Sequence, residues 1–140
     1  MRKGVTLSEV REIKLSTGKV LAKVTDKIGH VIFNNPTRHN AVSLEMWDAV
    51  EEALVGFSTN KDVRVVVLSG AGGKSFVSGA DISKFDSERG SKDDVNHYNS
   101  RIKMVYNLIE NYTKPTIAMI NGYCIGGGLN LASCTDFRIV

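Results

Sequence analysis

Residues 63–70, VRVVVLSG, constrain the fold more than any other stretch of the chain. The branched apolar run from Val65 to Leu68 has no polar interruption, which is typical of a strand buried on both faces of a parallel sheet. The preceding segment, SLEMWDAVEEALVGF, spaces its apolar residues by four and three and predicts an amphipathic helix of about four turns. Its apolar positions are Met46, Val50, Leu54 and Phe57. A helix beside a buried strand predicts an α/β fold.

Residues 19–35, KVLAKVTDKIGHVIFNN, alternate apolar and polar side chains around a DKIG turn. This alternation predicts a β-hairpin with one buried face. Its apolar positions are Val20, Ala22 and Val24 in the first arm and Ile28, Val31 and Phe33 in the second. After the hairpin, Ser43 stands where the N-cap of the first helix is expected.

The second half of the chain repeats strand and helix patterns. Apolar residues alternate at three and four positions between Val95 and Tyr112, which predicts a second long helix that ends before Pro115. In front of it, DSERGSKDD has no apolar residue and predicts a mobile surface loop. TIAMINGY predicts a buried strand, and GGGLNLASCTD predicts a short helix that opens on the glycines. The last residues, DFRIV, look like half of a strand, so we expect the chain to be a fragment of a larger fold.

Composition excludes several classes of function. A chain of 140 residues with 42% apolar residues fits one domain, and its 18 basic and 15 acidic residues are scattered, which argues against nucleic acid as a partner. The start, MRKGVTLSEV, lacks the apolar core of a secretion signal, and no run of 18 apolar residues predicts a membrane span. These features predict a cytoplasmic protein without a membrane partner.

Cysteine and histidine positions predict neither a disulfide nor a metal site. Cys124 and Cys134 lie in apolar surroundings and are expected to be buried thiols. His30, His39 and His97 have no metal-ligand spacing to each other or to the cysteines.

The segment GAGGKS after the central strand resembles two phosphate-binding patterns but fits neither. A P-loop requires glycine five places before Gly73, where this chain has Leu68. The dinucleotide pattern fails because Ser75 stands where its third glycine belongs. The segment is therefore interpreted as a strand-to-loop turn.

Two segments, FVSGADI and GYCIGGGLNL, share one design in which a strand enters a turn of small residues and a helix follows. Free N–H groups at helix starts bind negative charge. If the two starts face each other, one N–H from each can hold a single oxygen, as in an oxyanion hole. The alternative is that the three glycines only relieve crowding where a helix crosses a strand.

These segments carry a resemblance to a known family. FVSGADISKF and NGYCIGGGLNLASCTDFRIV resemble the two signatures of the crotonase superfamily, the enoyl-CoA hydratases and isomerases, and NPTRHNAVSLEMW resembles its N-terminal segment. The resemblance implies a spiral of ββα units, of which residues 1–140 would form a partial core domain without the C-terminal helical part. It also implies an acyl-CoA substrate bound by its thioester, no separate cofactor, a role in fatty acid metabolism, and homo-oligomers, either trimers or hexamers.

The resemblance also assigns site residues. The oxyanion donors would be the N–H groups of Ala80 and Gly127, and the segment with Arg38 and Asn40 would border the nucleotide end of CoA, where Arg38 could meet phosphate. Arg38 has the alternative of an ordinary solvated loop charge. Asp81 is either a substrate contact or, as an aspartate directly after SGA, a cap of the following helix. The remaining implied substrate contacts are Ser78, Ile82 and Gly126.

Asn130 departs from the family pattern. Hydratases of this family carry a glutamate two residues after the triple glycine, and this chain has Asn130 there. An amide cannot take up and return a proton near neutral pH, so the two-glutamate hydration mechanism is not supported. The resemblance then favours an isomerase or another branch, with Asn130 orienting substrate or water or having no role. A non-catalytic acyl-CoA-binding module is the alternative.

Overall fold

The computed structural model describes residues 9–140, and the prediction for the start MRKGVTLSEV falls largely on residues outside this range. The main sheet has six strands in the order β1-β2-β3-β4-β6-β8. Its strands are β1 (Arg11–Ile13), β2 (Val20–Thr25), β3 (Ile28–Phe33), β4 (Val65–Gly70), β6 (Thr116–Met119) and β8 (Phe137–Ile139). A second sheet pairs β5 (Ser75–Val77) with β7 (Tyr123–Cys124).

The predicted hairpin and parallel strands are both confirmed. Strands β2 and β3 pair antiparallel, with Ala22 opposite Val31. From β3 onward the main sheet is parallel, and Leu68 of β4 lies between Val31 of β3 and Ala118 of β6. These three side chains are buried in one core, which fixes the register because a shift by one residue would turn them to the other face.

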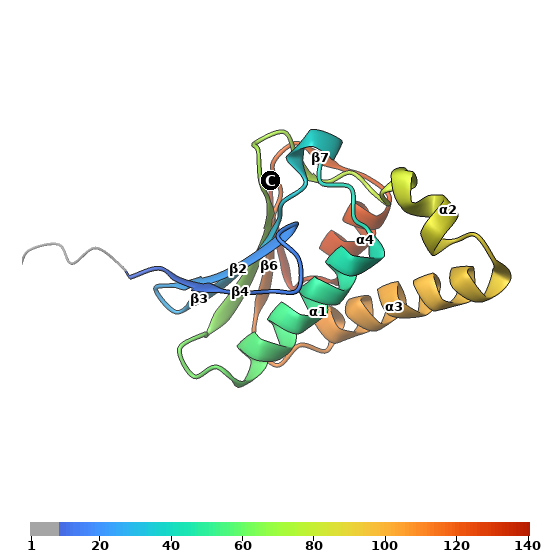
Figure 1. The fold of residues 1–140 in the computed structure, drawn as a ribbon. Helices are drawn as coiled ribbons and strands as arrows, with labels where there is room; N and C mark the ends of the chain where they lie inside the picture. The colour runs from blue at the N-terminus through green and yellow to red at the C-terminus, as the bar shows by residue number, and fades with distance from the viewer. Residues whose placement is uncertain (1–8) are drawn as a thin grey trace, which may run out of the picture.

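Three helices cover one face of the main sheet: α1 (Leu44–Thr59), α3 (Lys92–Glu110) and α4 (Gly127–Cys134). Figure 1 shows all three on the same side of the strands. The four predicted apolar positions of α1 are fully buried, as the helical spacing required. Arg101 of α3 forms ion pairs with Asp48 and Glu51 of α1, so the two helices are also joined at the surface.

Burial on both faces of β4 is the part of the strand prediction that is wrong. Val66 and Leu68 are fully buried, whereas Val65 and Val67 on the opposite face are only half-buried. The same alternation places Ile28 on a different face from Val31 and Phe33. The reason is that the helices cover only one side of this sheet.

The prediction that DSERGSKDD is a loop is also wrong, although the segment does lie at the surface. Its first residues form α2 (Phe85–Glu88), which follows the short 3-10 helix η2 (Ile82–Lys84), and its last residues begin α3. The Ser91 side chain caps α3 by accepting from the N–H of Asp94 at 3.0 Å. A charged segment can be helical where caps satisfy the helix ends.

Other local predictions need smaller corrections. Ser43 occupies the N-cap of α1, but its hydroxyl makes no capping hydrogen bond. The predicted strand TIAMINGY is divided, because β6 ends at Met119 and Tyr123 belongs to the second sheet. Cys124 and Cys134 are free thiols, as expected, but half-buried rather than buried.

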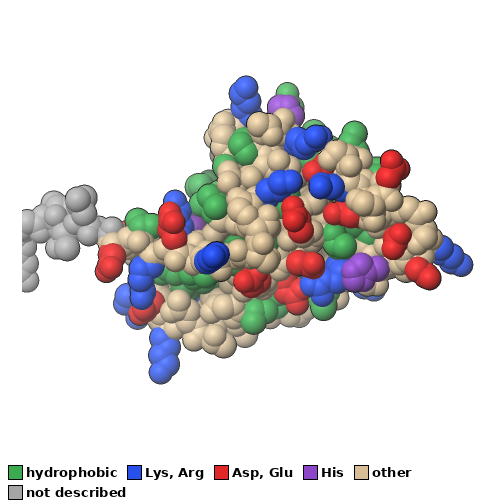
Figure 2. All heavy atoms as spheres, in the orientation of Figure 1, with side chains coloured by type: hydrophobic (Ala, Val, Ile, Leu, Met, Phe, Trp, Pro, Cys, Tyr) green, Lys and Arg blue, Asp and Glu red, His purple; other side chains and the backbone are tan. Residues whose placement is uncertain are grey.

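The described surface carries charges of both signs. Figure 2 shows acidic and basic side chains interspersed on the face in view, which agrees with their scatter in the sequence. Among residues 9–140, no helix is long and apolar enough to cross a membrane.

Candidate active site

The second sheet brings together the two turns that the sequence analysis singled out. Strand β5 leads into residues 78–81, here called the SGAD turn, and β7 leads into residues 125–127, the IGG turn. The two strands run parallel, and the N–H of Ile125 donates to the carbonyl of Val77 at 3.1 Å. Parallel pairing places both turns at the same end of the sheet. A Cβ on Gly126 would lie 3.9 Å from the Cα of Gly79, so the turns face each other at van der Waals distance.

The three glycines of residues 126–128 serve three different purposes. Gly126 has φ of 56°, in the left-handed region that glycine adopts without strain. At Gly128 a Cβ would come within 2.1 Å of the carbonyl oxygen of Val77, so crowding between α4 and β5 excludes any side chain. Gly127 has neither constraint, since a Cβ there would make only ordinary contacts. The crowding explanation therefore holds for Gly128 and leaves Gly127 unexplained by packing.

The SGAD turn is held by pairing with the residue before α1. The N–H of Val42 donates to Gly79 at 2.9 Å, and the N–H of Asp81 donates to Val42 at 3.1 Å. Because peptide groups alternate in direction along an extended chain, the N–H of Ala80 points away from Val42. No acceptor within residues 9–140 pairs with this N–H. Ala80 thus offers a free donor on the side that faces away from α1.

Gly127 offers a second donor in a different way. It is the first residue of α4, and the opening N–H groups of a helix have no intrahelical partner. Gly128 and Asn130 donate to Ile125 and Gly126, whereas the N–H of Gly127 has no acceptor in the described part of the chain. The structure therefore brings two turns with free N–H groups into contact, and the role of Ala80 and Gly127 as oxyanion donors stays a prediction.

Asp81 caps the helix that follows it, as one of the two interpretations expected. Its Oδ1 accepts from the N–H of Ser83 at 3.1 Å and from the Ser83 hydroxyl at 2.6 Å. The residue is 2% exposed, so its carboxylate is turned into the protein. The alternative assignment of Asp81 as a side-chain contact of substrate is not supported. Its Oδ2 and the Ser43 hydroxyl are buried atoms without a partner in the described residues.

Asn40 has a structural role that the sequence analysis did not predict. It is fully buried, accepts from the N–H of Asn35 at 2.8 Å, and donates to the carbonyls of Ala71 and Ser75 at 2.9 and 2.7 Å. The side chain of Asn40 therefore holds the loop together, and a border of this segment with the nucleotide end of CoA stays a prediction.

Arg38, in contrast, is exposed on the same loop. Its carbonyl accepts a long hydrogen bond of 3.5 Å from the hydroxyl of Ser78, which brings the loop beside the SGAD turn. A hollow of about 300 Å³ separates this loop from residues 71–75 and is lined by Thr37, His39 and Lys74 among others. Arg38 therefore lies on a loop that borders both a hollow and a candidate donor.

Exposed apolar side chains surround the two turns. Ile82 is 74% exposed, Ile125 55% and Leu129 57%. A cluster of apolar side chains beside free backbone donors suits a ligand with a polar head and a hydrocarbon part. Asn130 is exposed on α4 next to this cluster.

Tyr106 of α3 is the site residue that sequence reasoning missed. Its hydroxyl donates to the carbonyl of Gly127 at 3.3 Å, and its ring packs edge-on against Trp47 with centroids 5.6 Å apart. Burial raises the pKa of Tyr106 to about 12. The helical stripe of α3 passes through Val105, so Tyr106 lies at its edge and nothing in the spacing marks it. Only the packing of α3 on α4 reveals its position.

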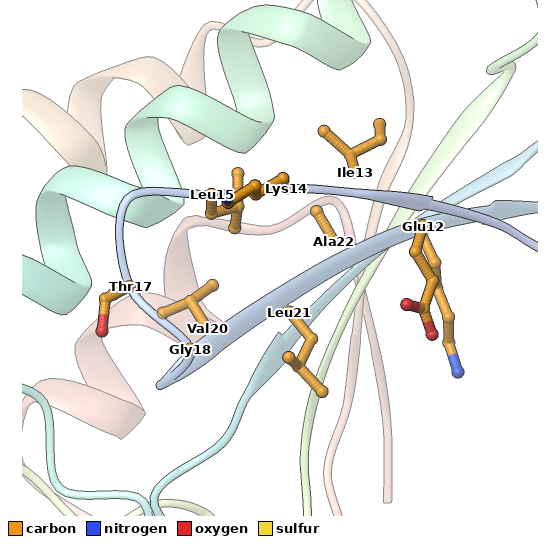
Figure 3. A pocket seen from close by; sticks show the side chains of 10 residues that line it. Glu12, Ile13, Lys14, Leu15, Thr17, Gly18, Val20, Leu21 and Ala22 are labelled. Carbon is orange, nitrogen blue, oxygen red and sulfur yellow. The ribbon is translucent and has the colours of Figure 1, made fainter.

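A larger hollow of about 520 Å³ lies away from the two turns (Figure 3). It is formed by β1, β2 and the segment between them, with Ile13, Leu15 and Val20 in its lining. None of the residues in the two turns lines it, so we do not assign it to the candidate site. Among the described residues, no group of three metal-ligating side chains is close enough to hold a metal ion.

Comparison with known proteins identifies a family and several relatives that the chain resembles. The family model for enoyl-CoA hydratase/isomerase matches residues 23–140. Crotonyl-CoA hydratase of Syntrophomonas wolfei is 32% identical over 120 residues, which are 86% of this chain and 45% of that protein. The peroxisomal Delta(3,5)-Delta(2,4)-dienoyl-CoA isomerase of Arabidopsis thaliana is 36% identical over 133 residues, or 87% of this chain and 48% of that protein.

Solved structures agree with the sequence matches. The crystal structure of an enoyl-CoA hydratase/carnithine racemase from Magnetospirillum magneticum superposes with a TM-score of 0.82 at 36% identity and covers 89% of this chain and 46% of that one. The chain thus spans about half the length of the relatives that it matches.

Proposed function

The chain belongs to the enoyl-CoA hydratase/isomerase family, and from this premise we propose that its two facing turns bind the thioester oxygen of an acyl-CoA. The N–H groups of Ala80 and Gly127 would form the oxyanion hole. The observation that carries the proposal is that both N–H groups lack an acceptor in the described residues while the turns around them are fixed by hydrogen bonds.

Such a pair of donors has a direct chemical use. When a proton leaves the carbon next to a thioester, negative charge builds up on the thioester oxygen. Two rigid N–H donors stabilise that charge more than they stabilise the neutral thioester, and one such donor is typically worth about 2.7–4 kcal/mol of transition-state stabilisation. The site would therefore favour reactions that pass through a thioester enolate.

Neighbouring groups fit the rest of such a substrate. The exposed side chains of Ile82 and Ile125 would contact its hydrocarbon part, and Gly126 would let it approach the backbone. Ser78 joins the SGAD turn to the loop of Arg38, whose guanidinium is available to a phosphate of CoA. The proposal needs no cofactor other than the CoA of the substrate itself.

Asn130 limits the type of reaction. An exposed amide beside the site can hold a water molecule or a substrate oxygen, but it cannot act as the acid and base of hydration. We therefore favour isomerisation, or another reaction through an enolate, over two-glutamate hydration. The same observation favours a second candidate function, acyl-CoA binding without turnover.

Binding and turnover assays separate these candidates. The chain should bind butyryl-CoA, and turnover should be measured with crotonyl-CoA for hydration and a 3-enoyl-CoA for isomerisation. Isomerisation would support the enzymatic proposal, whereas binding without turnover would support the second candidate. Absence of thioester binding would refute both. Location in the cytoplasm and assembly into homo-oligomers remain predictions, to be checked by fractionation and sedimentation.

A further inference from the structure

The hydroxyl of Tyr106 lies beside Gly127, the residue that carries the second proposed donor. Its hydroxyl oxygen would be 3.5 Å from a Cβ on Gly127, so it approaches the residue that carries the second donor. The absence of a side chain at Gly127 keeps the space between them open. Trp47 of α1 fixes the ring from the other side in an edge-on contact with an interplanar angle of 89°.

The hydroxyl has a long hydrogen bond to the carbonyl of Gly127, and the side chain of Asn130 is a second hydrogen-bonding neighbour. Its hydrogen bond to the carbonyl of Gly127 measures 3.3 Å, whereas O–H···O bonds in proteins are commonly about 2.7–2.8 Å. Tyr112, on the same side of the fold, differs in this respect because its hydroxyl is 2.5 Å from the carbonyl of Leu54. The bond from Tyr106 to Gly127 is thus the longer of the two, and a negatively charged oxygen within reach would be a better acceptor for this hydroxyl.

The surroundings keep this hydroxyl protonated. Burial, and after it the nearby Cys134, raise the pKa of Tyr106 to about 12, although a hydrogen bond with the side chain of Asn130 lowers it. A neutral phenol near physiological pH is always a donor. An oxygen that gains negative charge is the acceptor that strengthens such a bond most.

We propose that the hydroxyl of Tyr106 is a third hydrogen-bond donor to the thioester oxygen, beside the N–H groups of Ala80 and Gly127. This inference rests on the proposed function. No covalent bond is made or broken at Tyr106. The hydroxyl keeps its proton and exchanges its hydrogen bond to the carbonyl of Gly127 for one to the enolate oxygen. The residue would act mainly on the charged state of the ligand, and this makes its role measurable.

Acetoacetyl-CoA is the probe, because it ionises to an enolate that is followed by its ultraviolet absorbance. The chain should bind it with a larger enolate fraction than in free solution at the same pH. Tyr106→Phe keeps the ring and removes the hydroxyl, and it should lower the bound enolate-to-keto ratio by about tenfold to a hundredfold, as expected for a hydrogen bond to a charged group. Its affinity for butyryl-CoA, which forms no enolate under these conditions, should stay within about twofold.

Tyr112→Phe is the matched control, since it removes a half-buried hydroxyl from the same region without touching either turn, and it should leave the ratio unchanged. A second variant, with 3,5-difluorotyrosine at position 106, carries a more acidic phenol and should raise the ratio, a change that a purely structural role would not produce. An unchanged ratio in both Tyr106 variants would overturn the inference and leave the proposed function standing. Failure of the unmodified chain to bind either thioester would overturn the proposed function itself.

Discussion

The SGAD turn and the IGG turn present the same chemical group, a free backbone N–H, but they hold it in different ways. The SGAD turn is fixed by contacts, with Val42 paired to both sides of Ala80 and the Asp81 carboxylate capping the next helix. The IGG turn is fixed by the absence of side chains, since Gly126 adopts positive φ and Gly128 lies against Val77. One donor depends on polar partners and the other on available space, so substitutions should affect the two turns differently.

The largest effect is expected from removing one donor of the IGG turn. Gly127 is the first residue of α4, the helical position where proline is best tolerated, so Gly127→Pro should delete the N–H and leave the helix in place. The bound enolate fraction of acetoacetyl-CoA should then fall about a hundredfold or more. Gly127→Ala keeps the N–H but places a Cβ 3.5 Å from the hydroxyl of Tyr106, so it should lose clearly less than Gly127→Pro. Equal losses in both variants would contradict a role for the N–H itself.

The next effect is on stability and follows from space alone. Gly128→Ala would place a methyl group 2.1 Å from the carbonyl oxygen of Val77, and we expect the free energy of unfolding to drop by about 3 kcal/mol. Urea titration would measure the loss. Gly56→Ala on α1, where a Cβ meets nothing within 4 Å, should instead stabilise the chain by about 0.5–1 kcal/mol.

A smaller effect is expected where the SGAD turn loses its polar cap. Asp81→Ala removes the acceptor of the two bonds from Ser83, and a lost helix cap costs about 1 kcal/mol. Asp81→Asn keeps the acceptor oxygen and should cost less. If both variants melt at the temperature of the unmodified chain, the turn is held by Val42 alone.

The smallest effect concerns pH and Glu88, whose carboxylate accepts from the N–H of Leu44 at 2.8 Å. Burial, aided by the nearby charge of Asp81, raises the pKa of Glu88 above its ordinary value of 4.5 despite the bond to Leu44. The folded state therefore binds the proton of Glu88 more tightly than the unfolded state does. This contribution to the free energy of unfolding is present in full below pH 4.5 and is lost as the pH rises through the raised pKa. Glu88→Gln should flatten this dependence. Melting curves between acidic and neutral pH would show it, and parallel pH profiles would count against it.

Local patterns predicted the first half of the fold well. The hairpin and α1 depend on neighbours along the chain, and Val20, Val24 and Met46 are buried as their spacing required. The burial of β4 was less predictable, because elements distant in sequence decide whether one or both faces of the sheet are covered. The helical DSE of α2 was hidden by its charge, since the spacing carries no apolar signal there.

The candidate site was predictable in its backbone and unpredictable in its side chains. Small residues after two strands pointed to the two turns, and the resemblance to the family assigned Ala80 and Gly127 within them, a role that stays a prediction. The β5–β7 pairing that brings the turns together joins residues 47 and 48 positions apart through very short strands, so no local pattern predicts it. Asn40 contacts the carbonyl of Ser75, and Tyr106 contacts the carbonyl of Gly127. Both roles depend on tertiary contacts, which the spacing of residues in the sequence does not predict.

Strand β8 has a consequence for how the molecule behaves at high concentration. It is an edge of the main sheet, and Phe137 and Ile139 on it are 61% and 57% exposed. The side of β8 that faces away from β6 is a template on which a further strand can pair, and no charged side chain on the strand except Arg138 opposes this. Solutions of this chain should accordingly scatter more light per molecule as they are concentrated, and a charge placed at Ile139 should make that scattering independent of concentration.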